Sequence, residues 1–209
     1  MPAFNEQDTI GKVIDNAKNH IEKIVVVDDG SIDKTFEIAS KCNKVIVIKN
    51  EINKGYDFSL GKGFEIAIKN NADIIVSFDA DGQHDSDDID RIVKPILINK
   101  ADLVVGKRPY RARFTEHLFS CYSKKKIGVD DPLCGLKAYS AEVYKKIGYF
   151  DKINSIGTQL MFNAIENGFR LEQIDISLNK RKDTPRFGRM LVANYKIFMA
   201  MLRIIFKRK

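Results

Sequence analysis

The 209-residue sequence has only three cysteines, Cys42, Cys121 and Cys134, and no C-x-x-C spacing among them. Their odd number and wide separation argue against a disulfide framework and against a cysteine-ligated zinc site. The amino terminus shows no signal-peptide pattern. We therefore expect a reduced, cytoplasmic setting.

Long hydrophobic runs are also absent. No uninterrupted apolar stretch reaches the roughly 18 residues of a membrane-spanning helix, so we expect a soluble or peripheral protein. Internal repeats, low-complexity segments and a Pro/Gly/Ser-rich linker are lacking as well. With 44% hydrophobic residues, the chain is long enough to bury one substantial core, and a single domain with an appendage is expected.

Positive charge is concentrated at one end of the chain. Residues 180–209 contain ten Lys or Arg and one acid, Asp183, which gives this tail +9. The whole chain carries +7, so residues 1–179 carry −2. Such a localised charge suits an anionic partner: nucleic acid, phospholipid headgroups or a phosphorylated substrate. The tail has no recognisable nucleic-acid-binding module, so nucleic acid is the weaker candidate.

Apolar runs of strand length alternate with segments of helical periodicity. The predicted strands are Ile24–Val27, Val45–Ile48, Ile74–Phe78 and Leu103–Val105. Helix starts are predicted at the capping residues Asn5, Asp33, Ser86 and Ser140. This alternation predicts an α/β fold with a mostly parallel sheet flanked by helices.

Two basic segments have a different character. Residues 107–126 hold many Lys and Arg with one acid, Glu116, and their weak periodicity predicts a mobile basic loop. The second segment, Met190 to Phe206, is apolar but interrupted by Lys196 and Arg203. A 17-residue helix would be about 25 Å long, slightly short for a bilayer core. We predict either an amphipathic helix on a membrane surface or a helix packed on the domain's own core.

Two aspartates one residue apart, Asp79 and Asp81, follow the apolar run that ends at Phe78. Residues i and i+2 of a strand point to one side, so both carboxylates can face a single cation. In open α/β sheets, ligands collect at the carboxyl ends of buried strands. The pair therefore predicts a site for a metal ion and a phosphate.

A second acidic turn, at Asp28 and Asp29, ends another predicted strand. A carboxylate there can accept hydrogen bonds from a nucleobase or a ribose hydroxyl. A plain strand-to-helix turn with a capping Asp explains the same residues equally well.

Taken in order, six sequence blocks resemble family 2 glycosyltransferases of the GT-A fold, and within that family the dolichyl-phosphate or polyprenyl-phosphate sugar (mannose or glucose) synthases. The resemblance runs from Pro2 to about residue 190, and its most specific block is the run from Asp79 to His84. The blocks are Pro2-Ala3-Phe4-Asn5-Glu6, Val26-Val27-Asp28-Asp29-Gly30-Ser31, Asp33-x-Thr35, Gly61-Lys62-Gly63, Asp79-Ala80-Asp81-Gly82-Gln83-His84 and Asp131-Pro132-x-Cys134-Gly135-Leu136-Lys137.

The resemblance implies a metal-dependent, inverting transfer of a sugar from a GDP- or UDP-linked donor, with Mg²⁺ or Mn²⁺ as the cofactor. It places the metal at Asp79, Asp81 and Gln83, with Asp81 also catalytic. The residues it assigns to the nucleotide sugar are Pro2, Ala3, Asn5, Glu6, Asp28, Asp29, Lys62, Gly63, Asp79 and Ala80. The backbone of the Gly61-Lys62-Gly63 block is expected to approach the donor closely, with Lys62 available to a phosphate. Without the resemblance, a glycine turn at a helix amino terminus explains this block equally well.

The implied acceptor is a polyprenyl or dolichyl phosphate at the cytoplasmic face of the membrane. Because its phosphate is already anionic, it needs aligning cations rather than a general base. Arg108 and Arg181 match the family's arginines best and are predicted to be catalytic. They are also expected to bind the acceptor phosphate, together with Arg113. The remaining candidate cations are Arg111, Arg186 and Arg189.

Two other functions stay open. One is transfer to a soluble or cell-surface glycan, with Asp130 or Asp131 as the base. The other is a non-catalytic nucleotide-sugar-binding relative.

The family has a strand before the Pro2 block, whereas here Met1 precedes it directly, so we expect that strand to be missing and favour a truncated or misassigned start. We predict domain boundaries of 1–189 for the GT-A domain and 190–209 for the basic tail helix.

Overall fold

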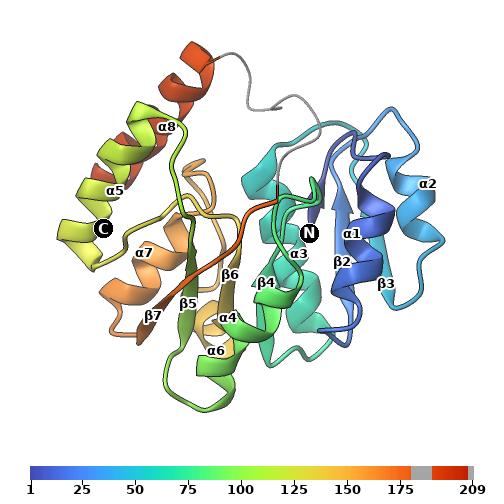
Figure 1. The fold of residues 1–209 in the computed structure, drawn as a ribbon, viewed down its shortest axis with the longest axis horizontal. Helices are drawn as coiled ribbons and strands as arrows, with labels where there is room; N and C mark the ends of the chain where they lie inside the picture. Colours follow the sequence, from blue (N-terminus) through green and yellow to red (C-terminus); the bar gives the residue numbers. More distant parts are fainter. Residues whose placement is uncertain (180–189, 207–209) are drawn as a thin grey trace.

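The computed structural model describes residues 1–179 and 190–206 and forms an α/β fold with two sheets (Figure 1). The first sheet has the order β1 (Pro2–Ala3), β2 (Ile24–Asp28), β3 (Val45–Lys49), all parallel. The second has the order β4 (Ile74–Ser77), β6 (Lys137–Ser140), β5 (Leu103–Lys107), β7 (Leu171–Asp175). In this second sheet, β6 runs antiparallel to its neighbours β4 and β5, whereas β5 and β7 run parallel to each other.

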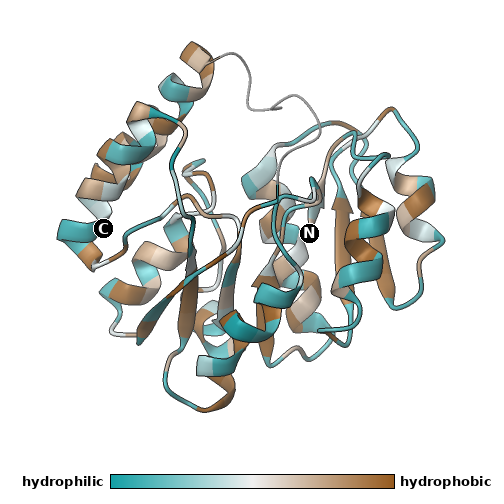
Figure 2. Cartoon of the chain, in the orientation of Figure 1, coloured by the Kyte–Doolittle hydropathy of each residue, from teal (hydrophilic) through white to brown (hydrophobic). Residues whose placement is uncertain are grey.

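Helices connect these strands and cover the sheets. They are α1 (Ile10–Ala17), α2 (Thr35–Ser40), α3 (Tyr56–Lys69), α4 (Asp87–Leu97), α5 (Phe114–Ile127), α6 (Ala141–Ile147), α7 (Gln159–Glu166) and α8 (Met190–Ile205). The predicted fold class and all four predicted strands are confirmed, with boundaries within two residues. Figure 2 shows these strands as mostly hydrophobic ribbons between more mixed helices.

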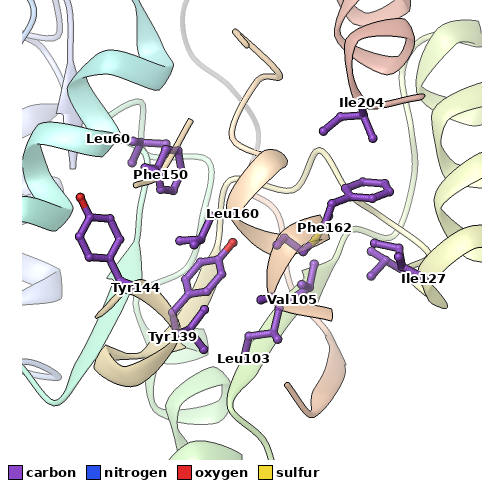
Figure 3. Close-up of a cluster of buried hydrophobic side chains, with 14 of the residues drawn as sticks. Leu60, Leu103, Val105, Ile127, Tyr139, Tyr144, Phe150, Leu160, Phe162 and Ile204 are labelled. Carbon is purple, nitrogen blue, oxygen red and sulfur yellow. The ribbon is translucent and has the colours of Figure 1, made fainter. Parts of the chain in front are cut away.

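Strands β2 and β5 begin with continuous apolar runs because both of their faces are buried. Alternate residues of β5 go to opposite sides: Leu103 and Val105 join one hydrophobic core, and Val104 joins the other. The larger core also takes side chains from α3, α5, α6, α7 and α8, among them Phe162 and Ile204 (Figure 3). A sheet buried on both faces is typical of parallel α/β folds.

Several local predictions are corrected by the structure. Ser86 and Ser140 occupy the N-cap positions of α4 and α6 as predicted, but α1 has Thr9 at its N-cap. Asn5 instead accepts a hydrogen bond from the Ile32 amide at 3.0 Å, with its own φ at +54°. Asp33 precedes the N-cap of α2 by one residue, and its carboxylate accepts a hydrogen bond from the Thr35 amide.

Two local predictions are corrected by helices. The mobile loop predicted over residues 107–126 is wrong from Phe114 onward, where α5 begins. The Gly61-Lys62-Gly63 block lies inside α3, so it is not a turn at a helix amino terminus, and its residues do not line the cavity described below. A methyl group at Gly61 would rest 3.5 Å from Cβ of Phe150, so this glycine packs against the core.

Strand β1 is short, and its residues Pro2 and Ala3 pair in parallel with Val27 and Asp28. The strand that was expected to be missing lies ahead of Pro2, so that expectation stays a prediction. Among the described residues, no strand pairing links the two sheets.

Helix α8 packs on the body of the protein. Its buried residues Ala193, Ile197, Ala200 and Ile204 recur at helical spacing, and Asn194 accepts a hydrogen bond of 2.7 Å from the Thr115 hydroxyl of α5. The tail helix thus shares the larger core. In the part of the chain that is described, no helix is long and apolar enough to cross a membrane.

Candidate functional site

A cavity of about 480 Å³ opens at the carboxyl ends of the strands. Its volume lies within the ordinary range for small-molecule sites. It brings together ten of the residues predicted from the sequence: Pro2, Ala3, Glu6, Asp29, Asp79, Ala80, Asp81, Gln83, Arg108 and Arg113. Residues separated by more than 100 positions in the chain therefore meet in one site. This agrees with the prediction that a ligand site lies where apolar strands end in acidic residues.

Asp79 lies just beyond β4 and is held on both sides. The Tyr56 hydroxyl donates a hydrogen bond of 3.1 Å to its Oδ1, and Nε2 of His84 lies 3.5 Å from its Oδ2. Burial alone would raise the pKa of the Asp79 carboxyl, but His84, Tyr56 and the charge of Lys137 outweigh burial and lower it. The carboxylate is therefore ionised at neutral pH, as a metal ligand must be.

Asp81 and Gln83 follow in a tight turn. Oδ1 of Asp81 accepts a hydrogen bond of 3.0 Å from the Gln83 amide, and both side chains line the cavity with Asp79. Two carboxylates and one amide oxygen are the donors that Mg²⁺ or Mn²⁺ prefers, so the donor set fits such a cation.

The protein groups alone do not enclose a cation. Among the described residues, no three His, Cys, Asp or Glu side chains cluster closely enough to hold a metal. Mg²⁺ usually keeps waters and binds substrate phosphates besides one or two carboxylates. The fit at Asp79, Asp81 and Gln83 is therefore that of an open site, which a diphosphate and water would complete.

Asp29 organises the rim of the cavity beyond β2. One oxygen accepts hydrogen bonds from the Asn50 side chain at 2.8 Å and the Lys54 amide at 2.9 Å, and the other accepts one from the Gly55 amide at 2.8 Å. The carboxylate thereby fixes the loop that carries Asn53 and Gly55 into the cavity wall. Gly30 makes this turn possible, because a methyl group there would lie 2.7 Å from the Ile52 carbonyl carbon.

Arg108 is held rigidly by two acids. Its Nε and Nη2 donate to the two oxygens of Asp131 at 2.7 and 2.8 Å, and Nη2 also lies 3.2 Å from Glu116. Glu116 in turn accepts a bond of 2.8 Å from Arg113. A fixed, planar guanidinium is well suited to bind a phosphate, and these bonds leave the N–H groups of Nη1 for a ligand.

Some predicted residues do not reach the cavity. Lys62 donates a hydrogen bond of 3.0 Å to Asn50, which in turn donates one to Asp29 of the cavity lining. Asp28 is fully buried, and its carboxylate accepts a hydrogen bond from the Ser31 amide. Arg111 donates a hydrogen bond of 2.6 Å to the Asp130 carbonyl. Asn5 and Gly63 also lie outside the cavity lining. Arg181, Arg186 and Arg189 lie outside the described residues.

The structure adds functional candidates that sequence reasoning missed, chiefly Tyr56, Lys137 and Lys196. Lys137 is a buried lysine of β6 whose Nζ donates to the Gly157 carbonyl at 3.1 Å. Burial lowers its pKa. Lys196 enters the lining from α8. The charged Lys137 at the end of the Asp131–Lys137 block was visible in the sequence, but nothing there pointed Lys196 toward this site.

An exposed apolar surface borders the cationic side of the cavity. We call it the α5–α8 surface, and it consists of Phe114, Leu118, Leu191, Val192, Tyr195 and Phe198. The contact between Thr115 and Asn194 joins the two helices, and Lys196 and Ile197 of α8 line the cavity itself. Single exposed apolar side chains are ordinary on soluble proteins, but six of them on two helices that contact each other beside the cavity are a candidate interaction surface.

Comparisons with known proteins agree with this geometry. The family model described as "Glycosyl transferase family 2" matches residues 1–166. The UDP-N-acetylglucosamine–dolichyl-phosphate N-acetylglucosaminyltransferase of Methanococcus voltae is 29% identical, covering 98% of this chain and 94% of that protein. An uncharacterized protein of Methanocaldococcus jannaschii is 32% identical, covering 97% and 89%.

Among solved structures, glucosyl-3-phosphoglycerate synthase from Mycobacterium tuberculosis, in complex with Mn²⁺ and UDP-glucose, superposes with a TM-score of 0.77. The match covers 97% of this chain and 76% of that one, at 21% identity. At this level of identity, the similarity establishes the shared fold.

Proposed function

Because this chain belongs to glycosyltransferase family 2, we propose that it moves a sugar from a nucleotide diphosphate sugar to a polyprenyl or dolichyl phosphate at the cytoplasmic face of a membrane. The observation that carries the proposal is one cavity with two chemically different ends. Asp79, Asp81 and Gln83 lie at the donor end, and Arg108 and Arg113 at the acceptor end, beside the α5–α8 surface.

At the donor end, Asp79, Asp81 and Gln83 would hold Mg²⁺ or Mn²⁺ against the diphosphate. When bound, such a cation neutralises the negative charge that grows on the departing nucleoside diphosphate. Tyr56 and His84 orient Asp79 for this task. Pro2, Ala3 and the loop fixed by Asp29 form the wall against which the nucleotide would lie.

At the acceptor end, the chemistry favours a phosphate over a hydroxyl. A phosphate oxygen attacks as an anion and needs no general base, whereas a glycan hydroxyl does. The two candidate bases, Asp130 and Asp131, lie outside the cavity lining. Asp131 is also committed to Arg108, whose hydrogen bonds outweigh burial and lower the pKa of that carboxyl, which weakens it as a base.

The α5–α8 surface supports a lipid-linked acceptor. A polyprenyl chain can lie along its apolar side chains while the phosphate enters between Arg108, Arg113 and Lys196. The same surface would rest on the membrane interface, with the Lys124–Lys126 cluster of α5 facing anionic headgroups. Relatives named as acting on dolichyl or undecaprenyl phosphate agree with this acceptor class.

The proposal is tested with the purified protein, a panel of UDP- and GDP-linked sugars, Mn²⁺, and two acceptors. The acceptors are a short-chain polyprenyl phosphate and the matching polyprenol, which lacks the phosphate. We expect transfer to the phosphate alone, and loss of that transfer in Asp81→Asn with an unchanged unfolding midpoint. Transfer to soluble glycans but not to polyprenyl phosphate would overturn the proposed acceptor, and donor binding without transfer to any acceptor would favour a non-catalytic relative.

A further inference from the structure

The loop between α6 and α7, residues 148–158, contains a strained residue. Ile156 has φ at +57°, in the left-handed region that β-branched side chains strongly disfavour. The other described non-glycine residues with positive φ are asparagines and one lysine. Asparagine tolerates this conformation because its short polar side chain can form local hydrogen bonds, whereas an isoleucine side chain cannot. Backbone geometry therefore gives no reason for an isoleucine at this position.

The strained conformation is held in place by two charged side chains. The Asp57 carboxylate of α3 accepts hydrogen bonds from the Ile156 amide at 3.0 Å and from the Gly157 amide. Nζ of Lys137 donates a hydrogen bond of 3.1 Å to the Gly157 carbonyl. Strained residues persist where their surroundings fix them in this way, and they cluster at functional sites. The geometry thus directs attention to what the Ile156 side chain contacts.

Ile156 reaches the functional cavity. It is half-buried, lines the cavity and also packs against the larger core. The adjoining backbone lies on that core, because a methyl group on Gly157 would be 3.7 Å from Leu60 and 3.8 Å from Phe150 (Figure 3). Of residues 148–158, all of which the structure describes, Ile156 is the one that lines the cavity. The strained loop therefore presents one aliphatic side chain to a ligand.

Two neighbours of the loop place Ile156 near the metal-binding end of the cavity. A methyl group on Gly157 would lie 3.3 Å from Cε1 of Tyr56, so the loop backbone lies against this ring. The Tyr56 hydroxyl bonds to Asp79 at 3.1 Å. Lys137, which holds the Gly157 carbonyl, lines the cavity together with Asp79. A sugar attached to a diphosphate at Asp79 would project into the part of the cavity that Ile156 borders.

An aliphatic side chain acts on a sugar through shape. It cannot form a hydrogen bond with a hydroxyl group, but it fills space that a substituent of the sugar ring would need. One methylene group more or less in such a pocket changes discrimination between substrates by about 10- to 200-fold. A side chain fixed by a rigid loop discriminates better than a mobile one, because it does not move aside for the larger ligand.

We propose that Ile156 is a specificity-determining residue, which contacts the transferred sugar and limits the size of the substituent that the sugar ring carries at that point. This inference rests on the proposed function, since it requires a nucleotide sugar in the cavity. The strained backbone, fixed by Asp57 and Lys137, holds the side chain at a set position relative to Asp79. Replacing Ile156 by a smaller residue should therefore favour larger sugars.

The test uses the whole chain, Mn²⁺ and three probes: UDP, UDP-glucose and UDP-N-acetylglucosamine. The two sugars differ by one acetamido group. Ile156→Gly opens the space without straining the backbone, because glycine adopts positive φ freely. We expect calorimetry to show that the affinity for UDP-N-acetylglucosamine relative to UDP-glucose rises by about 10-fold, with an unchanged affinity for UDP. An unchanged ratio of the two sugar affinities would overturn the proposal.

Two further variants separate a contact with the sugar from a structural role. Ile156→Val removes one methyl group and should move the ratio in the same direction by a smaller factor. Asn154→Gly is the matched control, because Asn154 lies in the same loop with φ at +53° but is exposed and outside the cavity lining. It should keep the wild-type ratio. Equal loss of affinity for all three probes in Ile156→Gly, with a lower unfolding midpoint, would show a structural residue and contradict the proposal.

The binding readout keeps this inference separate from the proposed function. A shifted ratio in Ile156→Gly, in a protein that transfers no sugar to polyprenyl phosphate, would support the role of Ile156 and overturn the proposed transfer alone. Transfer by the wild type, with the same ratio of affinities in the wild type and Ile156→Gly, would overturn the role of Ile156 alone.

Discussion

The Tyr56 hydroxyl donates a hydrogen bond of 3.1 Å to Oδ1 of Asp79, which ties the first residue of α3 to the acidic turn after β4. A group that orients a metal ligand typically affects metal affinity by 10- to 100-fold when it is removed. We therefore predict that Tyr56→Phe raises the Mn²⁺ concentration for half-maximal sugar transfer by about 10-fold. The Mn²⁺ dependence of the initial rate measures this effect.

The matched control is Tyr149→Phe. Its hydroxyl accepts a hydrogen bond of 3.0 Å from Asn163, and Tyr149 does not line the functional cavity. This variant should keep the wild-type Mn²⁺ dependence. If both tyrosine variants behave alike, Tyr56 has no special role at Asp79.

Gly135 leaves room for the same carboxylate. A methyl group at this position would lie 2.0 Å from Oδ2 of Asp79, so Gly135→Ala must push the carboxylate away. A displacement of about 1 Å at a reacting centre can cost about 100-fold in rate, and we predict a loss of that size in kcat/KM. Steady-state kinetics at saturating Mn²⁺ test the prediction.

Gly61→Ala separates this steric effect from a general effect of replacing glycine. The new methyl group would sit at an ordinary contact distance of 3.5 Å from Phe150, inside helix α3. We expect normal activity and a gain of about 0.5–1 kcal/mol in the free energy of unfolding. Equal activity loss in the two glycine variants would argue against a specific clash at Asp79.

Strands such as β2 and β4 could be predicted from the sequence alone, because each begins with an unbroken apolar run. Helix α5 could not be predicted in this way. Its buried side includes the polar residues Thr115, Glu116, Ser120 and Ser123, so the hydropathy of the sequence does not show which side is buried. Strand β6 was missed for a similar reason, because the buried Lys137 opens it.

The residues of the site also divide into those that could be predicted from the sequence and those that could not. The residues at the ends of apolar strands, Asp29, Asp79 and Asp81, were predictable because local sequence fixes both the strand and its acidic end. Tyr56 and Lys196 were not, since helix packing alone brings α3 and α8 to the cavity. Lys62 matched a family block, but its place inside α3 directs it to Asn50.

The Asp57 carboxyl gives a pH dependence of stability. It accepts hydrogen bonds from the Ile156 and Gly157 amides, but burial, reinforced by the Asp151 charge, raises its pKa to about 6. In the unfolded chain the pKa is about 3.9, so between these values the folded state holds the proton more tightly. The resulting stability is complete below about pH 4 and is lost as pH rises through about 6.

We predict that Asp57→Asn flattens this part of the profile. Relative to the variant, the wild-type free energy of unfolding should fall between pH 4 and pH 7, by at most about 3 kcal/mol. Urea titrations at pH 4, 5, 6 and 7 measure the change. The exposed Asp8→Asn is the control and should follow the wild-type profile. Parallel wild-type and Asp57→Asn profiles would contradict the role of this carboxyl.

The α5–α8 surface leads to a prediction about membrane binding that is independent of the chemistry. Leu191 and Tyr195 are 83% and 64% exposed, whereas the buried side of α8 uses Ala193 and Ile197. Replacing both exposed residues by serine removes apolar contact area without changing the charge or the packed face of the helix. We predict at least about a 10-fold weaker association with anionic liposomes, measured by flotation.

Ile32→Ser is the matched control, since Ile32 is 94% exposed but follows β2, away from α5 and α8. Liposome binding by this variant should equal that of the wild type. In detergent, with a polyprenyl phosphate acceptor, the Leu191→Ser/Tyr195→Ser protein should keep kcat close to the wild-type value because the cavity lining is intact, and should show a higher KM for the acceptor because the polyprenyl chain loses part of the surface along which it lies. Normal flotation together with a loss of kcat in detergent would contradict the role of these two side chains in membrane docking.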